Sequence, residues 1–212
     1  VWILGGTLDQ KVGPGVVDAL HKQYSAWVPE SQIHFESNKP FAHHFPTLTK
    51  GTDCKKSESP FIGNCGYDAA GEILSHLYTD LKAPIEARDA NIKHLGTKVL
   101  PDELGETLGE NAYLYVPESC SDGNSCRLHI SFHGCNQNSD TIDLQFISGT
   151  GYNRWAESND IVVLYPQTKN SNMLPFNPQG CWDWWGYTDE NYANRQGKQI
   201  MAIEALVKQL SL

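Results

Sequence analysis

The sequence predicts an α/β fold, a mostly parallel β-sheet with helices on both faces, stapled by disulfides. Apolar strand-like runs alternate with segments of helical spacing along the chain, which is the order that such folds require. The run 160–166 is apolar almost throughout, as is typical of a strand buried on both faces of a parallel sheet. The 212 residues suit one domain with a sizeable core, and we expect that domain to cover 1–212.

The first third of the chain predicts a strand, a helix and a second strand. Residues 1–5 are apolar and are expected to form a buried strand. Pro14, followed by apolar residues at helical spacing from Val16 to Trp27, predicts a helix that begins near the proline. Residues 32–36 alternate between polar and apolar and predict a strand, whereas 37–65 are expected to be a long polar loop.

The middle of the chain predicts one helix and two neighbouring strands. Apolar residues recur at helical spacing over 67–81, and Pro84 is expected to close this helix. Residues 84–110 are rich in Asp, Glu and Gly and are expected to form a surface excursion. The segments 112–117 and 128–133 predict adjacent strands joined as a hairpin.

The last third predicts a helix over 151–158, a buried strand over 160–166 and a final helix over 201–210. We find no internal repeat, low-complexity segment or domain boundary in the sequence. The chain therefore ends with the same alternation of strand and helix with which it begins.

Composition excludes several classes of partner. With 40% hydrophobic residues, 6 Trp and 9 Tyr, the chain is globular and not disordered. A net charge of −9 argues against nucleic acid or anionic membranes as partners. No apolar run approaches the roughly 18–20 residues that a membrane span needs. The chain begins directly in an apolar strand, without a basic region before it, so we expect a mature or trimmed product.

An even set of cysteines indicates a disulfide framework. Six cysteines allow fifteen full pairings. The first two and the next two each bracket a short polar loop, so we expect two local bridges and one long-range bridge between the remaining pair. Zinc binding is the alternative, but no Cys-x2-Cys or His-x3-His spacing supports a metal site. Disulfides favour a secreted, extracellular protein. The residues concerned are Cys54, Cys65, Cys120, Cys126, Cys135 and Cys181.

A carboxylate and an imidazole in the first 43 residues are candidates for a catalytic acid–base pair. Asp9 follows a predicted strand, and α/β folds build their sites at the carboxyl ends of strands. His43 follows the next predicted strand, and in α/β hydrolases the acid precedes the histidine. Asp9 could instead cap a turn or helix, His43 could be an exposed loop histidine, and His44 competes for its role.

Residues 129–135, His-Ile-Ser-Phe-His-Gly-Cys, predict a strand that ends in an oxyanion loop. In α/β hydrolases a His-Gly turn after an early strand offers a backbone N–H to the developing oxyanion. Here Cys135 would supply that N–H, while its sulfur would stiffen the loop. The alternative is an ordinary turn between a strand and a loop.

The segment 180–187 contains three tryptophans and one tyrosine within six residues. Tethered by Cys181, this cluster could form an apolar wall beside the reacting centre. Trp184, Trp185 and Tyr187 are the candidate substrate contacts. The alternative is that these rings belong to the core.

The expected nucleophile is missing from the sequence. A serine esterase needs a Gly-x-Ser-x-Gly elbow, and no such pentapeptide occurs among the 212 residues. Ser148 is the least implausible internal nucleophile, but it lacks a strand-to-helix context. Acid and histidine here precede the oxyanion strand, whereas the usual α/β-hydrolase chain has the reverse order. We expect the missing strand–Ser–helix unit just before residue 1 in a permuted chain or just after residue 212 in an unpermuted one, so both chain ends would border it.

Together these motifs resemble secreted poly(3-hydroxybutyrate) depolymerases of the single-domain, circularly permuted α/β-hydrolase type. The resemblance implies that Asp9 is the triad acid, His43 the base and the Cys135 amide part of the oxyanion hole, and that position 44 is not catalytic. It also places an aromatic substrate contact on Tyr187, where the family has tryptophan. The matching segments are 9–14, 42–46, 64–71, 128–135, 151–156, 164–167 and 180–184.

We therefore expect an extracellular carboxylic-ester hydrolase that cleaves polyester chains or their oligomers through a Ser-His-Asp triad. The serine would come from a companion chain, because the family's elbow lies upstream of the acid. The resemblance implies no metal and no organic cofactor. The alternative from another class is a catalytically inactive binding module, or a fragment, that grips hydrophobic polymer.

Overall fold

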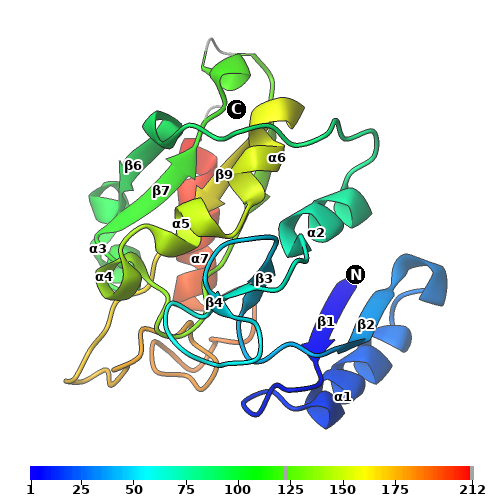
Figure 1. The fold of residues 1–212 in the computed structure, drawn as a ribbon. Helices are drawn as coiled ribbons and strands as arrows, with labels where there is room; N and C mark the ends of the chain where they lie inside the picture. The colour runs from blue at the N-terminus through cyan, green and yellow to red at the C-terminus, as the bar shows by residue number, and fades with distance from the viewer. Residues whose placement is uncertain (122–123, 211–212) are drawn as a thin grey trace.

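The computed structural model describes residues 1–121 and 124–210, and its strands form three separate sheets. The three sheets have two, three and four strands. Figure 1 shows β1 (Trp2–Gly6), β2 (His34–Lys39) and α1 (Pro14–Ser25) grouped on one side of the molecule, away from the four-stranded sheet. The α/β class is as predicted, whereas the prediction of a single, mostly parallel sheet is wrong.

The N-terminal unit follows the sequence prediction closely. β1 (Trp2–Gly6) pairs in parallel with β2 (His34–Lys39), and α1 (Pro14–Ser25) connects them. Pro14 lies in the first turn of α1, where its missing N–H costs no helical hydrogen bond. The strand over 1–5, the helix from Pro14 and the strand near 32–36 are therefore confirmed.

The second sheet lies where the sequence predicts only a loop. β3 (Phe45–Thr47) and β4 (Thr52–Asp53) both pair in parallel with β5 (Ile62–Asn64). Each strand has only two or three residues, which is too short for an alternating pattern to emerge from the sequence. The Cys54–Cys65 disulfide links the residue after β4 to the residue after β5.

Helix α2 (Ala69–Leu77) begins at a side-chain cap, because Asp68 Oδ1 accepts a 3.0 Å hydrogen bond from the Gly71 amide. The helix is confirmed, but it ends at Leu77, well before Pro84. The four-residue helix α4 (Ser139–Ile142) begins in the same way, with the Asn138 side chain as its cap. Short 3₁₀ turns cover Glu30–Gln32, Asp89–Asn91, Thr97–Val99 and Glu118–Cys120.

The four-stranded sheet is mixed. β7 (Asn111–Tyr115) pairs antiparallel with both β6 (Ile92–Gly96) and β9 (Ile161–Tyr165), and only β8 (Arg127–Ile130) runs parallel to β9. All residues of β9 are buried. The continuous apolar run of β9 indicates that both faces of the strand are buried, but it does not indicate the direction of the neighbouring strands. The prediction of a mostly parallel sheet was therefore wrong.

Two further predictions about this sheet are wrong. The segments 112–117 and 128–133 do not form a hairpin, because β9 lies between β7 and β8. Residues 84–110 are not only a surface excursion, because they contain β6 and the short helix α3 (Asp102–Gly105). The sequence of β6, Ile-Lys-His-Leu-Gly, has no regular alternation that would have indicated a strand.

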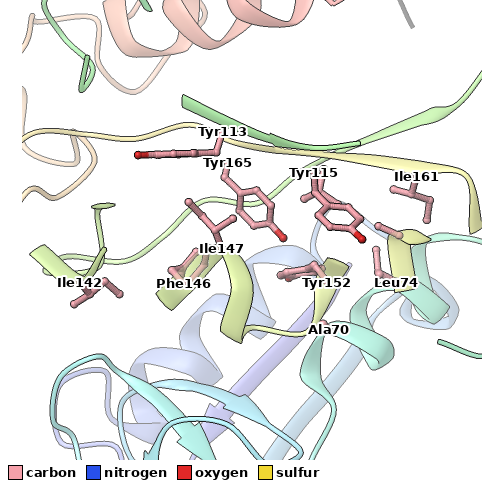
Figure 2. Close-up of a cluster of buried hydrophobic side chains, with 12 residues drawn as sticks. Ala70, Leu74, Tyr113, Tyr115, Ile142, Phe146, Ile147, Tyr152, Ile161 and Tyr165 are labelled. Carbon is pink, nitrogen blue, oxygen red and sulfur yellow. The ribbon is translucent and has the colours of Figure 1, made fainter. Parts of the chain in front are cut away.

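Helices cover both faces of the four-stranded sheet, as predicted. On one face, α2, α5 (Gln145–Gly149) and α6 (Tyr152–Asn159) pack on the tyrosines of β7 and β9, and Figure 2 shows these side chains gathered between sheet and helices. On the other face, α3 and α7 (Lys198–Gln209) enclose Ala112 and Leu164. The helices predicted over 151–158 and 201–210 are therefore confirmed, although α7 begins three residues earlier.

All three expected disulfides are formed, which confirms the predicted pairing. Among the described residues, no helix combines the length and the apolar character needed to cross a membrane.

Candidate active site

Asp9 is held by its own turn after β1. Its Oδ1 atom accepts hydrogen bonds from the backbone amides of Lys11 and Val12, both at 2.8 Å. An aspartate that bonds the amides just after it forms a local turn and loses side-chain freedom. The second carboxylate oxygen, Oδ2, is left free to face another residue.

His43 reaches this turn because Gly6 allows a close approach of the chain. A Cβ atom at Gly6 would lie 2.1 Å from the Phe41 carbonyl oxygen, so any other residue would push the two segments apart. The Leu8 amide donates to the same carbonyl at 3.1 Å. The His43 amide donates to Ser57 Oγ at 2.9 Å. The backbone on both sides of the histidine is therefore anchored.

His43 Nδ1 lies 2.9 Å from Asp9 Oδ2. A carboxylate only accepts, so Nδ1 carries the proton and Nε2 is the nitrogen left to take one up. The Asp9 side chain is 12% exposed and that of His43 is 43% exposed, so the carboxylate is sheltered while the imidazole remains accessible. Within the described residues His43 Nε2 has no hydrogen-bond partner, which suits a general base that awaits a hydroxyl.

His44 has a different environment. Its Nε2 donates to the Cys54 carbonyl at 2.6 Å, and its ring fills the space over Gly63, which has no side chain. His44 lies within ligand distance of the sulfurs of Cys54 and Cys65, but these sulfurs are joined in a disulfide and are not metal-binding thiolates. His44 therefore supports the fold of this loop and does not pair with Asp9.

In the turn formed by residues 134–137, just after β8, three of the four backbone amides have an acceptor. Gly134 donates to Gln137 Oε1 at 2.8 Å, Asn136 donates to the Gln179 carbonyl at 2.7 Å and Gln137 donates to the Gly134 carbonyl at 3.2 Å. Within residues 1–121 and 124–210, the Cys135 amide donates to no acceptor, and Cys135 is exposed. The Cys135 amide, which the sequence predicts as an oxyanion donor, is thus the unpaired amide of the 134–137 turn.

Gln137 connects this turn to the loop that holds His43. Its buried side chain accepts from the Gly134 amide and donates to the carbonyls of Pro60 and Phe61, both at 3.0 Å. The 57–61 segment also supplies Ser57, the partner of the His43 amide. Gln137 was not singled out from the sequence, because nothing in the sequence distinguishes this buried glutamine from an exposed one.

The Cys135–Cys181 disulfide attaches the aromatic segment to the turn after β8. Trp182 belongs to the interior: its Nε1 donates to the His133 carbonyl at 2.9 Å. Trp184 and Trp185 are exposed, and their ring centroids lie 5.2 Å apart. Trp182 therefore packs against the core, as one interpretation of the cluster expects, whereas Trp184 and Trp185 are exposed.

Tyr187 and Trp185 line an open pocket of about 600 Å³ with Leu174, Pro175 and Phe176. The Tyr187 hydroxyl donates inward to the Cys181 carbonyl at 2.9 Å, so only its ring is available to a ligand. Burial raises the pKa of Tyr187 to about 12. The 174–176 loop was not predicted as part of a site, although its consecutive exposed apolar residues were a visible signal in the sequence.

Ser148, the internal alternative nucleophile, lies within α5. Its hydroxyl donates to the Leu144 carbonyl at 2.9 Å, one turn earlier in the chain. It is therefore occupied by a local helical bond and does not stand at a turn between a strand and a helix.

Comparisons with known proteins identify relatives of this chain. No family model matches the chain. A poly(3-hydroxybutyrate) depolymerase of Delftia acidovorans is 36% identical over the whole chain, and a polyhydroxybutyrate depolymerase of Talaromyces funiculosus is 36% identical over 99% of it. The crystal structure of the PHB depolymerase from Penicillium funiculosum superposes with a TM-score of 0.92 at 32% identity, over 99% of this chain and 70% of that one. The chain belongs to the PHB depolymerase family.

A second solved PHB depolymerase, complexed with an R3HB trimer, gives the same TM-score of 0.92 at 33% identity and again spans 70% of that chain. The present chain spans 42% of the Delftia relative and 65% of the Talaromyces relative. The family resemblance stated from the sequence is therefore confirmed, over a part of the length of these depolymerases.

Proposed function

We propose that this chain supplies the acid, the base and one oxyanion donor of an extracellular carboxylic-ester hydrolase that cleaves poly(3-hydroxybutyrate)-type polyesters or their oligomers. The observation that carries the proposal is the 2.9 Å contact between Asp9 Oδ2 and His43 Nδ1 in a member of the PHB depolymerase family. The complex of a structural relative with an R3HB trimer supports the substrate class. Three disulfides support an extracellular location.

In the proposed reaction, a serine from outside this chain attacks the ester carbonyl while His43 Nε2 takes the serine proton. The negative charge that develops on the carbonyl oxygen is stabilised by the Cys135 amide together with an amide of the serine elbow. His43 then returns the proton to the departing alkoxide. Water, activated by the same imidazole, releases the acyl group in the second half of the cycle. The Asp9 carboxylate stabilises the imidazolium, and this chemistry calls for no metal or organic cofactor.

The serine is proposed to come from a companion segment that carries a strand–Ser–helix unit, as in a circularly permuted α/β hydrolase. In the described residues, β1 pairs only with β2 and β8 pairs only with β9, so each has one unpaired edge. Unpaired edges of this kind accept an additional strand. We therefore propose that residues 1–212 form one catalytic domain together with that segment.

Replacing the proposed base tests the function. In the assembled enzyme, H43A is expected to lower kcat on (R)-3-hydroxybutyrate oligomers by at least about 10³-fold, because serine, histidine and aspartate act as one unit. The matched control is H94A, which removes an exposed histidine on β6 and should leave hydrolysis unchanged. Full activity of H43A would refute the proposal.

A second candidate is a binding module without turnover. The exposed aromatic and aliphatic side chains near the pocket favour it, because Trp184 is 71% exposed and Leu174 is 94% exposed. Adsorption to a polyester film that is lost in a W184A/L174A variant, without release of soluble hydroxy acid by the assembled wild type, would favour this candidate over the esterase.

A further inference from the structure

We propose that His133 is a positioning residue that orients the peptide between Gly134 and Cys135, so that the Cys135 N–H faces the reacting ester. This inference rests on the proposed function, in which the Cys135 amide is an oxyanion donor; it explains what points that amide toward the ester. His133 itself is 2% exposed and therefore lies behind the turn, out of reach of substrate.

The contacts of His133 determine its tautomer. Its Nδ1 atom lies 2.7 Å from the Gly134 carbonyl oxygen, and a carbonyl only accepts, so Nδ1 carries the proton. Its Nε2 atom accepts from the Thr168 amide at 3.2 Å, so Nε2 carries none. Both contacts require the same neutral Nδ1–H form. Burial lowers the pKa of His133 to about 4, which keeps that form through the neutral range.

The bond from His133 Nδ1 is the shorter of two bonds to the Gly134 carbonyl, at 2.7 Å against 3.2 Å from the Gln137 amide, and together they orient the next amide. The peptide between Gly134 and Cys135 is trans, so its C=O and N–H are directed to opposite sides of one plane. With the carbonyl drawn inward by His133, the Cys135 N–H is turned away from the interior. Gly134 is also held from its other side, because its own amide donates to Gln137 Oε1 at 2.8 Å.

The imidazole is itself anchored on the side away from the turn. Thr168, whose amide bonds Nε2, also donates its hydroxyl to the Gly180 carbonyl, next to Cys181. Cys181 is joined to Cys135 by the disulfide. These contacts link His133, Thr168 and the Gly180–Cys181 segment back to Cys135, so the peptide that carries the unpaired amide is held from both ends. Such an arrangement holds a donor in place before charge develops, which is how oxyanion holes lower activation barriers.

Two substitutions distinguish the orienting role of His133 from a role in packing the interior alone. Asparagine can place an amide N–H close to the position of Nδ1, whereas glutamine can place an acceptor close to the position of Nε2. H133N should therefore keep the bond to the Gly134 carbonyl, and H133Q should lose it. The matched control is H129N, because His129 lies half-buried on β8 and contacts the Tyr78 and Tyr152 rings, not the turn.

The experiment measures kcat and KM for a soluble 3-hydroxybutyrate oligomer with the assembled enzyme. We expect H133A and H133Q to lower kcat on the order of 10- to 100-fold with KM unchanged, because an oxyanion donor acts in the transition state. H133N should recover most of kcat, and H129N should leave kcat at the wild-type value. Equal kcat in H133N and H133Q, or an unchanged kcat in H133A, would overturn the inference while the proposed function stands.

A second readout does not depend on turnover or on the folding of a variant. The ¹⁵N shifts of the His133 ring in the wild-type protein at neutral pH should show a protonated Nδ1 and an unprotonated Nε2. The opposite tautomer would overturn the inference directly. A wild-type assembly with no turnover would refute the proposed function, and this inference with it.

Discussion

Asp9 and His43, 34 residues apart in the sequence, meet through a single 2.9 Å contact between carboxylate Oδ2 and imidazole Nδ1. Each partner is positioned independently, since Asp9 is held by the amides of Lys11 and Val12 and the His43 amide is held by Ser57. The pair is therefore positioned by residues of this chain alone.

The contact makes Asp9 the residue that sets the tautomer of His43. D9N should lower kcat of the assembled esterase by on the order of 10³- to 10⁴-fold, because a neutral amide cannot stabilise the imidazolium and can favour the wrong tautomer. The measurement is steady-state hydrolysis of a soluble ester. D18N on the exposed face of α1 makes the same chemical change away from the site and should be silent. Comparable activity in D9N and D18N would show that the pair is only structural.

Gln137 should couple the turn over 134–137 to the loop that holds His43. In Q137E one oxygen can still accept from Gly134, but the other would face the Pro60 and Phe61 carbonyls, where the amide now donates. Leaving the Pro60 carbonyl without a donor is expected to lower the free energy of unfolding by about 1–3 kcal/mol, measured by urea denaturation at pH 7, whereas the Phe61 carbonyl keeps the Phe45 amide as a donor. Kcat should fall as well. Q145E, at an exposed position of α5, is the control, and equal stability of the two variants would contradict the bridging role.

The disulfides should differ in their contributions. Cys135–Cys181 closes a span of 46 residues and Cys120–Cys126 a span of 6, so chain entropy predicts losses of about 4 and about 2 kcal/mol when each pair is replaced by serines. Only C135S/C181S should also lower kcat, because that bridge holds the turn with the unpaired amide. Chemical denaturation and ester hydrolysis measure both effects. A larger loss of activity in C120S/C126S would contradict this assignment.

Asp183 should make the aromatic segment sensitive to acid. Burial raises the pKa of its carboxyl, but bonds from the Thr188 hydroxyl and from the amides of Thr188, Gly186 and Tyr187 outweigh burial, so the pKa is lowered overall. A pKa that is lower in the folded state stabilises the protein above the unfolded value of about 4, and that stabilisation is lost as pH falls through the folded value.

The corresponding variant is D183N. The difference in unfolding free energy between wild type and D183N should be largest at neutral pH and should shrink below about pH 4. Urea denaturation over a pH series measures it, with fluorescence of the nearby tryptophans as the probe. A difference that grows on acidification would have the wrong sign for this explanation.

The contact between Asp9 and His43 and the local elements could be predicted from the sequence better than the sheet that connects them. Asp9 and His43 each follow a strand whose pattern is readable, and their order matches that of α/β hydrolases. The pairing of β7 and β8 could not be read locally, because the strand that separates them, β9, comes some 30 residues later in the chain. The short strands of 45–64 are held by a disulfide and by neighbours, not by their own patterns.

The residues missed at the site share one property. The sequence places His133 in a His-Gly turn and does not distinguish Gln137, whereas the structure shows that both side chains are buried and bond backbone groups. Such partners depend on how the chain folds around them and leave no periodic signal. The exposed 174–176 loop is different, because an apolar run in a loop is visible in the sequence and could have indicated a binding surface.

The central claim is that Asp9 and His43 activate a serine outside residues 1–212. The most direct test is fluorophosphonate labelling of the assembled material, followed by denaturing mass spectrometry under reducing and non-reducing conditions. We predict that the label is found on a serine of a separate segment and that H43A abolishes labelling. Label on Ser148 or another serine of the 212 residues, or labelling that persists in H43A, would contradict the claim.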